Sequence, residues 1–172
     1  RLHTQHLFKK DATLSAFHDH FQNYQILHFS THAEADSLQT PRIELIDSTL
    51  FLPEIYNLPL DANLVVLSAC QTALGEEQNG EGLMSLARGF AYAGAPSLVA
   101  SLWKVNNKST SDLMTSFYAH LKAGNSKSDA LRLAKLDYLA TASTAQLSPY
   151  YWSGMVFIGA DNVVQFNQSI PL

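Results

Sequence analysis

The sequence has one cysteine, no basic run and no long apolar stretch, and each scarcity excludes a class of protein. A single cysteine, Cys70, cannot form a disulfide within the chain and is typical of a reducing compartment, so we expect a cytoplasmic protein. The 11 Lys and Arg residues are dispersed and the net charge is −4, which argues against nucleic acid as a partner. No apolar stretch approaches the roughly 20 residues that span a bilayer, so we expect no membrane partner either.

The residues that are present are typical of one globular domain. The chain has 172 residues, of which 47% are hydrophobic, enough for a single substantial core. It contains no internal repeat and no low-complexity linker, so residues 1–172 are expected to form one domain. Because the sequence begins with Arg1 instead of Met, we expect it to be the C-terminal part of a longer protein.

Four short runs rich in Val, Leu, Ile and Phe predict buried strands. They lie at residues 24–31, 63–69, 97–103 and 151–158, and turn residues bound each of them. Residues 3–8 predict a further short strand, and residues 42–52 predict a hairpin that turns near Asp47 and Ser48.

Helical spacing of apolar residues fills the intervals between these strands. It predicts helices at residues 13–21, 81–93, 109–123 and 126–140, with Gly94 and Gly124 as C-terminal stops. Ser109 and Ser126 are each followed three residues later by Asp, the spacing of a capping box. Strands alternating with helices predict an α/β fold with a mainly parallel sheet.

Two residues of chemical interest follow neighbouring strands of this expected sheet. His32 comes after the first predicted strand, and Cys70 comes after the second. Chemistry in parallel α/β sheets gathers at the carboxyl ends of the strands, so we expect the two side chains to lie at one edge. A histidine beside a cysteine can take the thiol proton during nucleophilic attack and then protonate a leaving amine. The backbone N–H groups of Ala33 and Cys70 are candidate donors to the oxyanion that such an attack creates.

Simpler interpretations of each residue were weighed beside this one. A lone cysteine after an apolar strand is often a small buried hydrophobe. His28 is expected to face the core or to pack beneath His32, four residues along the same strand. The remaining histidines have no cysteine or coherent acidic cluster near them in the sequence, so we predict no metal and no cofactor.

Four blocks of sequence together resemble the CHAT family of caspase- and separase-related domains, which in bacteria are often joined to tetratricopeptide repeats. The blocks are ILHFSTHA (residues 26–33), LVVLSACQTALG (64–75), GEGLMSLARGFAYAGAPSLVASLWKV (80–105) and YYWSGMVFIGA (150–160). The resemblance covers about residues 5–160, with the blocks in the family's order.

This resemblance implies a caspase-like three-layer α/β/α sandwich that cleaves peptide bonds through a dyad of Cys70 and His32. It implies that the substrate's P1 side chain lies between the strand that leads to the cysteine and the loop after the next strand. The residues at these places are Ser68, Trp103, Val105 and Asn106. It also implies a protein or peptide substrate and an upstream repeat or regulatory region. Because caspase-like sheets usually have six strands, we expect the first strand to be missing from this chain.

Three departures from the family pattern leave the preferred substrate open. Members often have Gly where this chain has Ala33, and Cys-Glu-Thr-Gly where residues 70–73 are Cys-Gln-Thr-Ala. Members often carry two aspartates where this chain has Asn106 and Asn107. Without these acids a basic P1 residue is less favoured, and a small, polar or apolar one is equally compatible with the sequence.

Other functions fit the sequence less well or stay open. A nucleotide-binding module is disfavoured because Gly75, Gly80 and Gly82 do not form a phosphate-binding Gly-x-Gly-x-x-Gly turn. A glutamine amidotransferase places its nucleophile on an elbow flanked by glycines and ahead of the histidine, whereas Cys70 lacks both glycines and follows His32. The alternative that stays open is a latent or non-catalytic interaction domain that keeps the peptidase fold. The sequence favours neither Glu34 nor Asp36 as a residue that orients His32.

Overall fold

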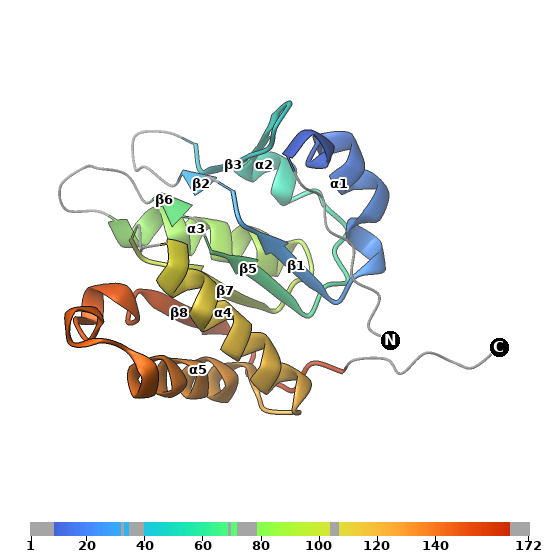
Figure 1. Cartoon of the computed structure of the whole chain (residues 1–172). Helices are drawn as coiled ribbons and strands as arrows, with labels where there is room; N and C mark the ends of the chain where they lie inside the picture. The colour runs from blue at the N-terminus through green and yellow to red at the C-terminus, as the bar shows by residue number, and fades with distance from the viewer. Residues whose placement is uncertain are drawn as a thin grey trace.

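The four apolar runs form one sheet. The computed structural model describes residues 9–31, 33–34, 40–68, 70–71, 79–103 and 107–165. The sheet has the order β1-β5-β7-β8, in which β1, β5 and β7 run parallel and β8 runs antiparallel to β7 (Figure 1). The bounds are β1 (Ile26–Phe29), β5 (Leu64–Leu67), β7 (Ser97–Ser101) and β8 (Met155–Gly159). The prediction of a mainly parallel sheet is confirmed, although each strand is shorter than the apolar run that predicted it.

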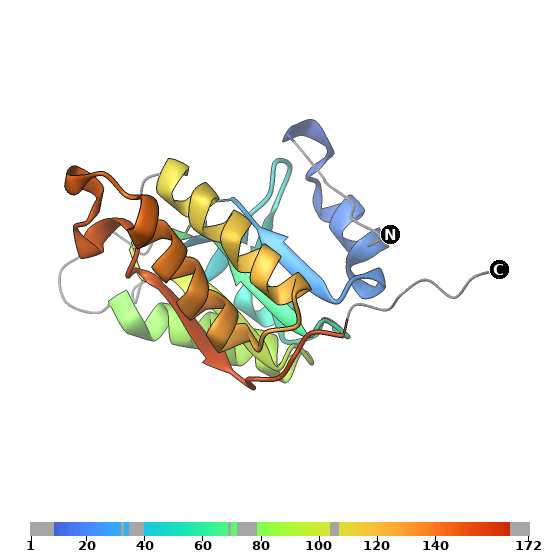
Figure 2. The ribbon, with the colours of Figure 1, turned by 60° about the horizontal axis from the view of Figure 1, so that its bottom comes forward.

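Helices cover both faces of this sheet. Every residue of β5 and β7 is buried, as expected for strands between two helical layers. One apolar cluster joins a face of the sheet to α1 (Leu14–His20), α2 (Leu52–Ile55) and α3 (Asn79–Tyr92). A second cluster joins the opposite face to α4 (Asn107–Lys122) and α5 (Lys127–Thr141) (Figure 2). The fold is therefore the three-layer α/β/α sandwich that the resemblance to the family implied.

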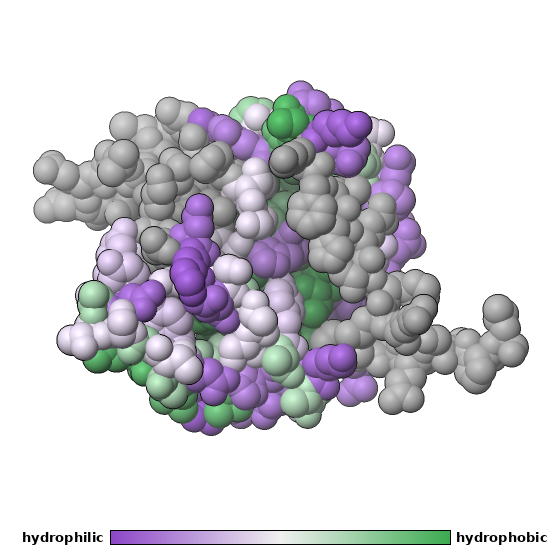
Figure 3. All heavy atoms as spheres, in the orientation of Figure 1, coloured by the Kyte–Doolittle hydropathy of each residue, from purple (hydrophilic) through white to green (hydrophobic). Residues whose placement is uncertain are grey.

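The outer surface of the α4–α5 layer is mixed in polarity. Figure 3 shows purple and pale side chains over these two helices, with green ones scattered among them. Such a surface is expected when each helix turns its apolar side to the sheet and its polar side to water.

Local capping signals determine where several helices begin and end. Thr13 accepts a hydrogen bond from the Ala16 N–H at 3.1 Å, at the start of α1. Gly94 follows α3 with φ +116° and Gly124 follows α4 with φ +90°, both in the left-handed region that glycine favours. Ser126 caps α5, as its spacing to Asp129 predicted.

The predicted start of α4 at Ser109 is wrong. The helix begins at Asn107, and Ser109 lies in its first turn with 1% of its surface exposed. Its hydroxyl bonds the Tyr138 hydroxyl of α5 at 2.9 Å. A serine followed by an aspartate three residues later looks like a cap in sequence, but packing of α4 against α5 uses this serine as a buried polar contact.

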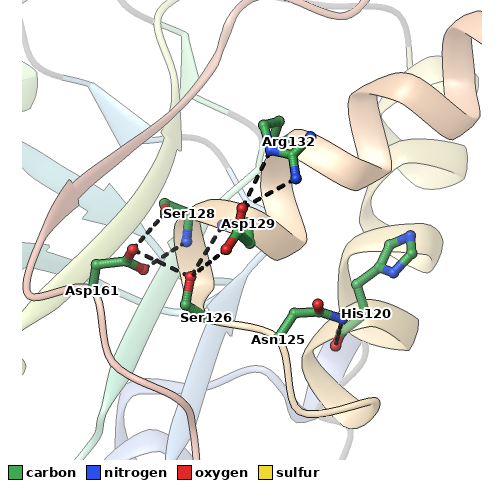
Figure 4. Close-up of polar contacts among 7 residues, drawn as sticks. All are labelled: His120, Asn125, Ser126, Ser128, Asp129, Arg132 and Asp161. Carbon is green, nitrogen blue, oxygen red and sulfur yellow. Dashed lines mark hydrogen bonds and ion pairs between the residues drawn. The ribbon is translucent and has the colours of Figure 1, made fainter.

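The start of α5 is tied to the segment that follows β8. Asp161 accepts hydrogen bonds from the Ser128 N–H at 2.8 Å and the Ser128 hydroxyl at 2.5 Å, and from the Ser126 hydroxyl at 3.2 Å (Figure 4). Lys127 is fully buried beside it and donates to Asn162 at 2.5 Å. These bonds hold the pKa of Asp161 below its usual value.

A second, smaller sheet contains the predicted hairpin. Its order is β4-β3-β2-β6, with bounds β2 (Ala33–Glu34), β3 (Arg42–Glu44), β4 (Thr49–Phe51) and β6 (Cys70–Gln71). The hairpin is confirmed, because β3 and β4 pair antiparallel and the Leu45 N–H donates to the Ser48 carbonyl at 2.8 Å. Four short 3-10 helices complete the described elements: η1 (Lys9–Asp11), η2 (Phe21–Asn23), η3 (Thr144–Gln146) and η4 (Pro149–Tyr151). The strand predicted at residues 3–8 lies outside the described residues.

Candidate functional site

The two chain segments that carry the predicted dyad leave the central sheet and pair again in the smaller one. β1 and β5 stay in register up to Phe29 opposite Leu67, and the Ser68 N–H donates to the Phe29 carbonyl at 3.0 Å. Parallel pairing resumes with Ala33 opposite Cys70. Figure 1 shows β2 and β6 beyond the ends of β1 and β5. The backbones of Ala33 and Cys70 are therefore neighbours at the carboxyl ends of two parallel strands.

The two segments differ in length at this break. Ala33 lies four positions after Phe29, whereas Cys70 lies three positions after Leu67, as the two registers require. The first segment thus carries one extra residue, as the bulged strand of a pair does. Thr31 in that segment donates its hydroxyl to the Glu44 carbonyl at 2.5 Å, which ties the break to the hairpin. Offsets of this kind redirect the side chains that follow them.

A chain of three polar side chains lies just before the break. The Nε2 atom of His28, on β1, is 2.7 Å from the Ser68 hydroxyl oxygen. The Nδ1 atom of the same ring is 2.9 Å from the Tyr118 hydroxyl oxygen of α4. The rings of His28 and Tyr118 lie 5.7 Å apart between centroids and are tilted by 41°. One imidazole therefore bridges a helix to the residue two positions before Cys70.

The electrostatic surroundings keep this network uncharged at neutral pH. The His28 ring is exposed on one side, yet the protein around the rest of it disfavours the imidazolium and lowers its pKa to about 4. Solvent on the exposed side weakens this effect of burial, but the pKa of His28 remains lowered. Burial raises the pKa of Tyr118 well above its usual value, so its phenol keeps its proton. The network then consists of a neutral imidazole between two hydroxyl groups.

Trp103 follows β7 and packs against the segment that precedes β8. Its indole N–H donates to the Tyr150 carbonyl at 2.9 Å, and its ring stacks on the Tyr150 ring with centroids 6.4 Å apart and an interplanar angle of 18°. A Cβ at Gly154 would come within 2.8 Å of the indole, so glycine permits this close approach. Tyr150 is exposed, which makes the pair an aromatic surface after the end of β7.

The predicted site residues are described to different extents. His32, Val105 and Asn106 lie outside the described residues. Cys70 and Ala33 are described as backbone, and that backbone is paired. The two others are described in full: Ser68 is buried in the polar network, and Trp103 packs on Tyr150. The assignment of catalytic and substrate-binding roles to these residues stays a prediction.

His28 and Tyr118 join the site although the sequence did not single them out. The prediction that His28 faces the core is wrong, because the ring is exposed and makes polar contacts on the α4 side. The alternative prediction, that His28 packs beneath His32, stays untested because His32 lies outside the described residues. A histidine within an otherwise apolar strand was the available signal for His28. Tyr118 is 90 positions away in the chain, and no local pattern relates the two.

A shallow hollow of about 110 Å³ lies elsewhere, between α3 and the start of β7. It is lined by residues such as Met84, Arg88 and Ser97, and β7 starts at Ser97, so the hollow is at the opposite end of the strands from Ser68. In the described part of the chain, no three His, Cys, Asp or Glu residues are grouped so that they could hold a metal ion. Among the same residues, no helix is both long and apolar enough to cross a membrane.

Comparison with known proteins gives concordant matches. A family model described as the CHAT domain matches residues 2–160. Tetratricopeptide repeat protein 28 of Mus musculus is 32% identical over 112 residues, and that of Homo sapiens is 32% identical over 108 residues. Each alignment covers 63% of this chain but only 4% of the relative, so the chain matches a small part of two much longer proteins.

Proposed function

Because this chain belongs to the CHAT domain family, which is related to caspase-like cysteine peptidases, we propose that it cleaves peptide bonds with Cys70 as nucleophile and His32 as base. The observation that carries the proposal is the pairing of Ala33 with Cys70. His32 immediately precedes Ala33 in the chain, and Ala33 is the residue that pairs with Cys70. This pairing supports the proposal, because it brings together the backbones of the two segments that carry the proposed dyad.

The proposed reaction is acyl transfer to the cysteine followed by hydrolysis. His32 takes the proton of the Cys70 thiol as sulfur attacks the peptide carbonyl carbon, and it then gives that proton to the leaving amine. A water molecule, deprotonated by the same imidazole, hydrolyses the thioester and regenerates the thiol. General acid–base assistance of this kind is worth roughly 10²- to 10⁴-fold in rate.

The tetrahedral oxyanion needs fixed N–H donors, and we propose those of Cys70 and Ala33 for this role. Cys70 is the stronger candidate because, among the described strands, β6 is the edge of its sheet while β2 pairs on both sides. A strand that pairs on both sides uses its N–H groups in the sheet, whereas an edge strand has N–H groups that a substrate can reach. Losing one oxyanion donor typically costs about 10²- to 10³-fold in kcat.

For substrate binding we propose the residues that follow β5 and β7. Trp103 is a described member of this group, and Val105 and Asn106 are further members. Ser68 is the other described member, and because it is buried we propose that it supports the substrate-binding surface from beneath. β5 and β7 are adjacent strands, with Leu67 opposite Ala100, so both segments leave the same edge of the sheet. We propose that the Trp103–Tyr150 pair forms an aromatic part of the surface that binds the substrate. A substrate peptide without a required basic P1 residue fits the neutral asparagine in this segment.

The name shared by the two relatives supports a proposal about the whole protein. Both are tetratricopeptide repeat proteins, and we propose that a repeat region of the same polypeptide regulates this domain. A cytoplasmic location stays a prediction that rests on the single cysteine of the chain.

Alkylation of the single cysteine tests the dyad without knowledge of the substrate. Iodoacetamide labelling, followed by intact mass, reports only Cys70, because the chain contains no other cysteine. We expect the labelling rate of the wild type to titrate below the ordinary thiol pKa of about 8.5, and that of His32→Ala to return toward it. His18→Ala, an exposed histidine on α1, is the matched control and should behave as wild type.

Peptide cleavage tests the full reaction. The wild type and Cys70→Ala are incubated with a proteome-derived peptide library, and new termini are identified by mass spectrometry. We expect cleavage by the wild type and none above background by Cys70→Ala. Equal cleavage by both, or labelling of Cys70 that is indifferent to His32→Ala, would refute the proposed function and favour an interaction domain.

A further inference from the structure

The His28 network lies on the α4 face of the central sheet, next to apolar side chains. His28 is paired with Val66, and the face of the sheet toward α4 carries Leu64, Val66 and Val99. Against this apolar background, the hydroxyls of Ser68 and Tyr118 meet on one imidazole. Apolar residues would fill the same interface without a need for hydrogen bonds. The three polar groups therefore call for an explanation other than burial.

Their position suggests what they do. β1 holds Ser68 twice, through the bond from the Ser68 N–H to the Phe29 carbonyl and through the contact between its hydroxyl and His28. Ser68 is 7% exposed and is the last described residue before the break that precedes Cys70. Tyr118 in turn fixes His28 from α4, whose first turn follows the segment that contains Val105 and Asn106. The network thus connects the segment that precedes Cys70 to β1 and α4.

The order hydroxyl, imidazole, third polar group is also found in serine nucleophiles activated by histidine. Ser68 differs from such a nucleophile because its hydroxyl is buried, with little surface open to a substrate. The third group is a neutral phenol, which cannot stabilise an imidazolium as a carboxylate does. These features favour positioning over nucleophilic attack.

We propose that His28 is a positioning residue, whose neutral ring carries its proton on Nε2, bridges Tyr118 to Ser68 and thereby fixes the backbone that leads to Cys70. The tautomer follows from acidity: a phenol is a stronger acid than an aliphatic alcohol, so Tyr118 donates to Nδ1 and the Nε2–H donates to Ser68. The importance of this role for catalysis rests on the proposed function, whereas the bridge itself does not.

Steady-state kinetics of peptide cleavage test the effect on catalysis. A nucleophile displaced by about 1 Å can lose about 10²-fold in rate, so we expect His28→Leu to lower kcat about 10- to 100-fold with little change in KM. His28→Gln should recover most of the loss, because an amide both donates and accepts hydrogen bonds. His120→Gln is the control: this histidine is on the same helix as Tyr118 but bonds Asp137, and its substitution should leave kcat unchanged.

Nuclear magnetic resonance of ¹⁵N-labelled histidine tests the bridge without any activity. His28 is assigned from the signal lost in His28→Gln, and we expect one protonated and one bare ring nitrogen, with the proton on Nε2. In Tyr118→Phe, which removes one hydroxyl and keeps the ring, the Nδ1 signal should shift and the alkylation rate of Cys70 should change. Tyr118→Phe also serves if His28→Leu does not fold.

The outcomes separate the two proposals. An inactive wild type whose Cys70 labelling ignores His32→Ala would refute the peptidase, yet the His28 tautomer would still report the bridge. Conversely, an active wild type with unchanged Cys70 labelling and unchanged kcat in both Tyr118→Phe and His28→Gln would overturn the positioning role. A proton on Nδ1 would overturn the assigned direction of the bridge, and labelling of Ser68 by a fluorophosphonate would show that it is a nucleophile after all.

Discussion

Removal of the Phe90 ring should destabilise the protein more than any surface change on the same helix. Phe90, on α3, is fully buried, and its ring centroid lies 6.1 Å from that of Phe29 on β1. Truncation of a buried Phe to Ala costs about 3–5 kcal/mol, because burial is lost and a cavity remains. A chain of this size loses about 2–4 °C in Tm for each kcal/mol, so Phe90→Ala should lower Tm by roughly 6–20 °C.

Urea denaturation followed by tryptophan fluorescence measures this cost. Tyr92→Ala is the control two positions along α3, since Tyr92 is 78% exposed and mainly contacts Tyr56, with ring centroids 5.5 Å apart. Loss of an aromatic pair of this kind costs about 0.5–1.5 kcal/mol. If Phe90→Ala cost less than about 1 kcal/mol, or no more than Tyr92→Ala, the packing of α3 on the sheet would be wrong.

Three further predictions concern stability. Cys70→Ala should change the free energy of unfolding by less than about 1 kcal/mol in urea melts, and a loss as large as that of Phe90→Ala would show that Cys70 is a packing residue. Gly94→Ala should lower the free energy of unfolding by about 1–3 kcal/mol, because φ is +116° and a Cβ would clash with the Leu60 carbonyl oxygen. Gly124→Ala should cost less, because a Cβ at Gly124, where φ is +90°, would meet no atom within 4 Å. Equal losses of stability in calorimetry would contradict this steric explanation. Folding lowers the pKa of Asp161, so the ionised carboxylate stabilises the protein above the unfolded-state pKa of about 3.9, and this stabilisation is lost as pH falls through the folded-state pKa. The free energies of unfolding of the wild type and Asp161→Asn should therefore converge in acid. A constant difference between them at every pH would contradict this.

Protonation charges His28, whereas it neutralises Asp161, but in both cases the protein loses stability as pH falls. Folding lowers its pKa to about 4 from 6.5, so the unfolded chain binds a proton between these values and the folded chain does not. Stability should therefore fall as pH falls from about 6.5 to about 4 and then level off. His28→Gln should lack this part of the pH dependence in chemical denaturation. A variant that keeps the full slope would show that His28 is not the group responsible.

Much of the fold was predictable because its signals are local. Apolar runs specified the four strands of the central sheet, and Thr13, Gly94 and Ser126 marked helix ends through backbone geometry and capping that involve only near neighbours. The hairpin of β3 and β4 also closes within a few residues. Even the approach of the two site segments was predictable, since parallel strands bring their carboxyl ends to one edge.

The sequence alone therefore predicted the succession of elements, the mainly parallel sheet and the family. Packing of the folded chain, in contrast, makes Ser109 a buried contact of α5 instead of a cap, and strand pairing leaves one extra residue on one side of the break before Ala33 and Cys70. Packing also joins His28 to Tyr118. The physical reason is the same in each case: these features depend on which side chains meet after packing, and residues 29, 40 or 90 positions apart leave no periodic trace in the sequence.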